Sequence, residues 1–107
     1  MNELKSGYTG RVLKEEAVVS CVGKGWENIV KNLIKDLFEL GWDGNVCQVK
    51  EKFGGLRFYI GSGSTEIFDR IDKAEQESFE TCEVCGAPGK PRSDGWIKTL
   101  CDACEEK

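Results

Sequence analysis

The chain contains no histidine. This absence removes the commonest general base at neutral pH, the Ser–His and Cys–His nucleophile pairs, and every metal site that uses imidazole. Catalysis would have to rest on carboxylates, lysines or tyrosines. We therefore expect a protein that is not an enzyme.

Long apolar runs and a surplus of basic residues are also missing. No stretch approaches the roughly 20 apolar residues that span a bilayer, and the N-terminus lacks the basic and then apolar pattern of a secretion signal. We therefore expect a cytoplasmic protein that does not contact membranes. The formal net charge of −4 argues against binding to duplex nucleic acid, which needs a broad basic footprint, but leaves room for a local anion pocket.

The 107 residues suffice for one domain with a small appendage. The apolar periodicities predict an α+β fold, in which an amphipathic helix and a second helix pack on a small antiparallel sheet. We place a boundary near Glu80, where helical periodicity gives way to cysteines, glycines and both prolines. This boundary divides the chain into an α+β core domain (1–80) and a cysteine module (81–107).

A β-hairpin is predicted over residues 46–60, where two alternating apolar runs flank Gly54-Gly55. With the two glycines as the turn, Lys52 would face Arg57 and Lys50 would face Tyr59. Glu51 would point to the apolar face and need a partner there. The residues expected on that apolar face are Cys47, Val49, Phe53, Leu56, Phe58 and Ile60.

The opposite face of this hairpin would be basic. Like charges that face each other across two strands cost roughly 0.2–1 kcal/mol, so their concentration beside a tyrosine indicates an anionic ligand. The alternatives are that acidic residues of a neighbouring helix neutralise them, or that the side chains extend into water. The residues of this face are Gln48, Lys50, Lys52, Arg57 and Tyr59.

Two helices are predicted around the hairpin. Apolar residues at three- and four-residue spacing indicate a helix over 26–40 that ends at Gly41 and lies across the apolar face of the hairpin. The second helix follows a Gly/Ser-rich loop, with Ser64 or Thr65 as its N-cap rather than as part of a phosphate loop. Its buried side would hold Ile67, Phe68, Ile71, Ala74 and Phe79. Residues 17–22 are rich in β-formers and indicate a strand or an extended segment.

The clearest motif is two C-x-x-C pairs, Cys82–Cys85 and Cys101–Cys104, separated by fifteen residues. This spacing is typical of a four-cysteine zinc site. Two disulfides or a redox C-x-x-C motif are the alternatives. Disulfides are disfavoured in a chain without an export signal, and a redox motif would not need a second pair. Four thiolates leave no open coordination position, so we expect structural Zn²⁺. Cys21 and Cys47 lie outside the pattern and are expected to be buried free thiols.

The cysteine segment resembles a treble-clef or zinc-ribbon-like finger. The resemblance implies a knuckle at Cys82–Gly86 and a hairpin over 88–100 that turns at Asp94-Gly95, with Trp96 and Ile97 on its returning strand. It also implies a terminal helix over 102–107. It implies a scaffold and no particular function.

The order of motifs over residues 21–107 resembles a family of short bacterial and bacteriophage proteins. The matching features are Gly23-x-Gly25-Trp26, the hairpin motif KEKFGGLRFY over residues 50–59, a helix, and C-x-x-C-G. The resemblance implies a phage or prophage setting in the host cytoplasm and assigns no activity to any residue.

These features lead to one functional hypothesis and two alternatives. In the first, Lys50, Lys52, Arg57, Tyr59 and Trp26 (with Trp42 in place of Trp26 as an option) bind a phosphate-bearing, nucleotide-derived molecule and sequester it from host immune signalling. In the second, the protein is an adaptor or inhibitor that docks on a host protein through the Trp96 hairpin and the basic face. In the third, the finger binds nucleic acid. The oligomeric state, including a homo-oligomer, stays open.

Overall fold

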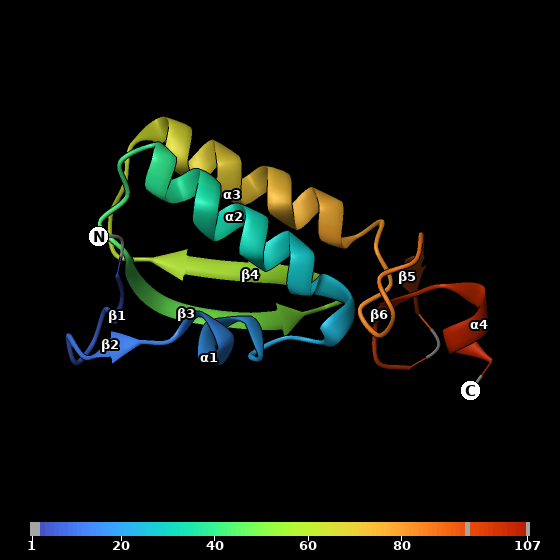
Figure 1. Cartoon of the computed structure of the whole chain (residues 1–107). Coiled ribbons are helices and arrows are strands. Elements are labelled where there is room, and N and C mark those ends of the chain that lie inside the picture. Colours follow the sequence, from blue (N-terminus) through green and yellow to red (C-terminus); the bar gives the residue numbers. More distant parts are fainter. Residues whose placement is uncertain (1–2, 94, 107) are drawn as a thin grey trace.

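A computed structural model of the chain describes residues 3–93 and 95–106, and it confirms the predicted α+β architecture. Helices α2 and α3 lie side by side on one face of a long hairpin formed by β3 and β4, and the cysteine segment lies at one end (Figure 1). The elements in chain order are β1 (Leu4–Ser6), β2 (Val12–Leu13), α1 (Glu15–Val19), the 3₁₀ turn η1 (Lys24–Trp26), α2 (Glu27–Glu39), β3 (Asn45–Lys52), β4 (Gly55–Ile60), α3 (Thr65–Ser78), β5 (Lys90–Arg92), β6 (Lys98–Leu100) and α4 (Asp102–Glu105). Within the described residues, no helix is both long and apolar enough to cross a membrane.

The main sheet has four strands in the order β2-β1-β3-β4. Strand β1 pairs antiparallel with β2 and parallel with β3, with Lys5 opposite Asn45 and Ser6 opposite Val46. The sheet is therefore mixed, and the N-terminal residues belong to it. Strands β5 and β6 form a separate antiparallel pair in the cysteine segment.

The hairpin forms where it was predicted, but its turn is one residue earlier. Lys50 faces Arg57 and Lys52 faces Gly55, so the two turn residues are Phe53 and Gly54. Both have positive φ angles, +53° and +80°, as in a type I′ turn. The pairing differs from the predicted one by two residues, and such a shift leaves each side chain on its predicted face.

Two residues of the predicted apolar face are not in the core. Phe53 is exposed because it occupies the turn. A bulge between Val46 and Gln48 turns Val46 inward, so Cys47 is only half-buried. The remaining members of the face are confirmed as buried or packed against the core: Val49, Leu56, Phe58 and Ile60.

The helix predicted over 26–40 is confirmed as η1 followed by α2. Its apolar stripe is buried against the hairpin, and Gly41 ends it with a φ angle of +93°. The N-cap of α3 is also confirmed, since the Ser64 hydroxyl accepts a 3.3 Å hydrogen bond from the Ile67 N–H. Phe68 was predicted to be buried, but it lies on the exposed side of α3.

The strand considered for residues 17–22 is wrong, because this region begins with the short helix α1. Glu15 and Glu16 lie in its first turn, where carboxylates favour a helix, and Val18 and Val19 are buried in the core. Burial of two adjacent valines outweighs their preference for strands.

Candidate metal centre and basic face

The four cysteines of the two C-x-x-C pairs converge. Their Sγ atoms lie within 4.8 Å of one another, and the Sγ atoms of Cys85 and Cys101 are 3.5 Å apart. All four are free thiols, so the alternative of two disulfides does not apply. Four sulfurs at about 2.3 Å from a tetrahedral ion lie roughly 3.8 Å from one another. The cluster therefore fits a metal ion.

A tight turn positions the first pair. The Cys82 N–H donates to the carbonyl oxygen of Ala87 at 2.8 Å, and the Gly86 N–H donates to the carbonyl oxygen of Cys82 at 2.9 Å. Gly86 has a φ angle of +84°, which a glycine adopts without strain. The glycine after the second cysteine thus closes the knuckle that the sequence predicted.

The second pair is held by β6 and α4. Cys101 is the N-cap residue of α4 and Cys104 lies within that helix. Arg92 on β5 binds the helix, because its Nη2 lies 2.8 Å from Asp102 and its Nη1 lies 3.1 Å from Glu105. The order of knuckle, hairpin and short helix is compatible with a treble clef.

The structure differs from the predicted finger at the terminal helix and at the returning strand. Helix α4 ends at Glu105 rather than at Lys107, and Lys107 lies outside the described residues. Gly95 has the expected positive φ angle of +90°, whereas Asp94 lies outside the described residues. Strand β6 begins at Lys98, so Trp96 and Ile97 precede the returning strand.

The thiols of the cluster differ in acidity. Burial opposes ionisation of Cys82, but backbone hydrogen bonds from Cys101, Cys85 and Val84 outweigh it and lower the pKa of Cys82 to about 6. Hydrogen bonds with Cys101 and Cys82 raise the pKa of Cys104 to about 12. Cys82 therefore ionises more readily than Cys104, and a bound cation would favour the thiolate form of Cys104.

The knuckle packs directly on η1. The Gly25 N–H donates to the carbonyl oxygen of Glu83 at 2.9 Å, and the indole N–H of Trp26 donates to the carbonyl oxygen of Thr81 at 2.8 Å. A methyl group at residue 25 would overlap the carbonyl oxygen of Cys82. The Gly-x-Gly-Trp motif therefore forms the surface on which the knuckle packs.

The same segment also packs on the hairpin turn. The Thr99 hydroxyl donates to the carbonyl oxygen of Gly54 at 2.6 Å. A methyl group at residue 54 would lie 3.2 Å from Ile97. The cysteine segment is thus joined to the core at both η1 and the β3–β4 turn.

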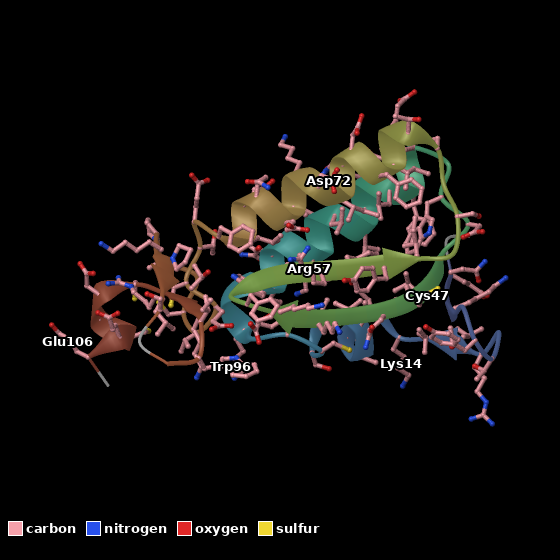
Figure 2. All side chains as sticks on the ribbon, turned by 180° about the vertical axis from the view of Figure 1, so that it is seen from behind. Lys14, Cys47, Arg57, Asp72, Trp96 and Glu106 are labelled. Atoms are coloured by element: carbon pink, nitrogen blue, oxygen red, sulfur yellow. The ribbon has the colours of Figure 1, made fainter. Side chains whose placement is uncertain are left out.

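The predicted basic face exists, but one of its cations is already paired. Arg57 Nη1 lies 3.0 Å from Glu75 Oε1 of α3, and Figure 2 shows Arg57 between β4 and α3. In the described part of the chain, neither Lys50 nor Lys52 has a carboxylate oxygen within 4.0 Å. Tyr59 is 42% exposed on the same face.

Two tryptophans considered for this face do not belong to it. Trp26 is fully buried and Trp42 is 4% exposed, so neither ring is available for stacking on a ligand at the surface. The prediction that Trp26 binds the ligand is therefore wrong. A residue in the interior fits the same amphipathic spacing as a residue at the surface.

Three further residues have defined environments. Glu51, predicted to need a partner, accepts a 2.7 Å hydrogen bond from the Gly54 N–H. Cys21 and Cys47 are free thiols as predicted, but Cys21 is exposed and Cys47 is half-buried.

Comparisons of the chain with models of protein families, with curated proteins and with solved structures give no match.

Proposed function

We propose that this chain is a binding protein without catalysis, whose basic hairpin face binds a phosphate-bearing small molecule. One observation carries the proposal: Lys50 lies directly opposite Arg57, and neither Lys50 nor Lys52 has a carboxylate within ion-pair distance among the described residues. An acidic chain that leaves two cations unneutralised beside a third favours an external anion.

The side chains of this face suit a nucleotide-derived ligand. Lysine ammonium groups attract phosphate as point charges, and the half-exposed Tyr59 ring offers a surface on which a base can stack. Arg57 is the least available of the three cations, because Glu75 occupies part of its guanidinium. The two lysines are therefore the principal anion-binding residues of the proposal.

Calorimetry with ADP as the probe tests this proposal. We expect ADP to bind, and the double variant Lys50→Glu/Lys52→Glu to bind at least tenfold more weakly with an unchanged melting temperature. The matched control is Lys35→Glu/Lys73→Glu, which makes the same charge change on exposed helix positions. Absence of ADP binding to the wild-type protein, or equal binding by both double variants, would refute the proposal.

We propose Zn²⁺ as the metal of the four-cysteine cluster. Support comes from the all-sulfur donor set and from sulfur separations that suit tetrahedral coordination. A closed site of four thiolates has a structural role, because no position is left for water or substrate. Native mass spectrometry should find zinc bound to the wild-type chain and not to Cys104→Ser. Retention of zinc by that variant would contradict the assignment.

A second candidate function is docking on another protein through the cysteine segment. The observation that favours it is the exposure of Trp96, Val84 and Phe53, which are 70%, 55% and 58% exposed. Exposed aromatic residues are enriched at protein interfaces. A partner captured by wild-type protein and by the Lys50→Glu/Lys52→Glu variant, but not by Trp96→Ala, would favour docking over anion binding.

A further inference from the structure

A hollow of about 380 Å³ lies where the knuckle, η1 and the end of β3 meet. None of the residues assigned to the basic face lines it. It exists because the knuckle packs against residues 23–25 and places its own side chains beside β3. The residues that line the hollow are Gly23, Lys24, Glu51, Glu83, Val84 and Lys98.

The acidic groups of this hollow are fixed, and one has an unused acceptor. The Oε1 atom of Glu83 is buried and has no hydrogen-bond partner among the described residues. The backbone of Glu83 is held on both sides, since its N–H donates to Thr99 and its carbonyl oxygen accepts from Gly25. Glu51 is held by its 2.7 Å hydrogen bond from the Gly54 N–H. A buried carboxylate oxygen without a donor is costly, and it leaves the charge of Glu83 without a hydrogen-bond donor inside the described part of the protein.

The basic groups of the hollow are also unmatched. In the part of the chain that the structure describes, neither Lys24 nor Lys98 has a carboxylate oxygen within 4.0 Å. The hollow therefore presents two carboxylates and two ammonium groups that do not pair directly with one another. A ligand of one charge sign would satisfy only half of them.

We propose that this hollow binds a zwitterionic small molecule of the α-amino acid class with a short aliphatic side chain. Its ammonium group would lie toward Glu51 and Glu83, and its carboxylate toward Lys24 and Lys98. Val84 supplies an apolar wall for the aliphatic part. The volume lies at the small end of the range of ligand pockets, which suits a single amino acid rather than a nucleotide.

Amide chemical shifts of the full-length, zinc-loaded protein, recorded with three probes, test the proposal. L-leucine carries both charges, 4-methylpentanoate lacks the ammonium group, and 3-methylbutylamine lacks the carboxylate. We expect L-leucine to shift the amide signals of Lys24, Glu51, Val84 and Lys98 in a saturable way, with at least tenfold weaker binding of either analogue. No saturable shift with L-leucine, or equal binding of all three probes, would overturn the proposal.

Matched variants separate this site from the metal centre and from the basic face. Glu83→Gln and Lys98→Met should each weaken L-leucine binding at least tenfold, whereas the exposed controls Glu80→Gln and Lys90→Met should not. Because Glu83 is adjacent to Cys82, cobalt absorption spectra should first show that the four-thiolate site of each variant is intact. Unchanged L-leucine binding by both Glu83→Gln and Lys98→Met would refute the site, while ADP binding by these variants independently reports on the basic face.

Discussion

The hydroxyl of Thr99 donates a 2.6 Å hydrogen bond to the carbonyl oxygen of Gly54, which lies 45 residues earlier in the chain. Thr99 is completely buried, and its own carbonyl oxygen accepts a hydrogen bond from the Glu83 N–H. A single threonine thus joins the hairpin turn, β6 and the knuckle. The segment that carries the four cysteines is therefore part of the packing that holds the hairpin turn in place.

We predict that Thr99→Val lowers the free energy of unfolding by about 1–3 kcal/mol, because the buried carbonyl of Gly54 loses its donor while the side-chain volume is kept. Urea unfolding of the zinc-loaded protein measures the effect. The control is Thr65→Val, the same change at an exposed position of α3. Equal stability of the two variants would show that the Thr99 hydroxyl does not support the fold.

Gly25→Ala should be more damaging than an ordinary glycine substitution. Its new methyl group would overlap the backbone of Cys82 and lie 2.7 Å from the Gly86 nitrogen, and neither group can rotate away. We expect a loss of about 2–3 kcal/mol or more, together with weaker retention of zinc. Gly61→Ala is the control, because a methyl group there meets nothing within 4 Å. Thermal unfolding and metal analysis that show the same behaviour for both variants would contradict this role.

The local parts of the fold were predictable from the sequence. Helix α2, its end at Gly41 and the Ser64 cap follow from apolar spacing and capping rules that involve neighbouring residues only. The four-cysteine cluster was predictable for a similar reason, because the two C-x-x-C spacings restrict how the ligands can meet.

The parts that depend on tertiary contacts were not predictable. The sequence predicted that Gly54-Gly55 forms the turn. Gly55 is a glycine for another reason, because the ring of Phe79 packs on it. A Cβ atom at residue 55 would lie 2.5 Å from that ring. Phe53 therefore takes the turn position. The apolar spacing that included Trp26 in the predicted helix 26–40 does not distinguish a ring at the surface from a buried one. The ion pair between Arg57 and Glu75 joins residues that are 18 apart in the chain.

The position of Phe53 predicts a stabilising substitution. Phe53 is the described non-glycine residue with a positive φ angle, +53°, and such a conformation is costly for a residue with a large side chain. Phe53→Asn should raise the free energy of unfolding by about 1 kcal/mol, because Asn-Gly is a preferred type I′ pair. Phe53→Leu removes the same aromatic ring without this benefit and serves as the control. Urea unfolding should rank Asn above Leu, and the reverse order would contradict the interpretation of the turn.

Arg92 should slow the release of the metal. Its guanidinium bridges the carbonyl of Leu100 to the carboxylates of Asp102 and Glu105, so it holds the helix that carries Cys104. We expect Arg92→Met to transfer zinc to a chelator several-fold faster than wild type. Lys90→Met, an exposed change on the same strand, should leave the rate unchanged. A chelator-coupled absorbance assay measures both rates, and equal rates would show that the bridge does not hold the site.

The pair between Arg57 and Glu75 predicts a gain of binding. The two side chains are 30% and 24% exposed, so their ion pair contributes at most about 1 kcal/mol to stability. In Glu75→Gln the guanidinium of Arg57 loses its competing carboxylate and becomes available beside Lys50, which it faces across the hairpin. We expect a several-fold higher affinity for ADP and only a small decrease in the melting temperature. The control Glu77→Gln makes the same charge change on α3 at a residue that does not pair with Arg57. An increase confined to Glu75→Gln would place the anion at the Arg57–Lys50 pair, whereas equal affinities of the two variants would remove Arg57 from the proposed site.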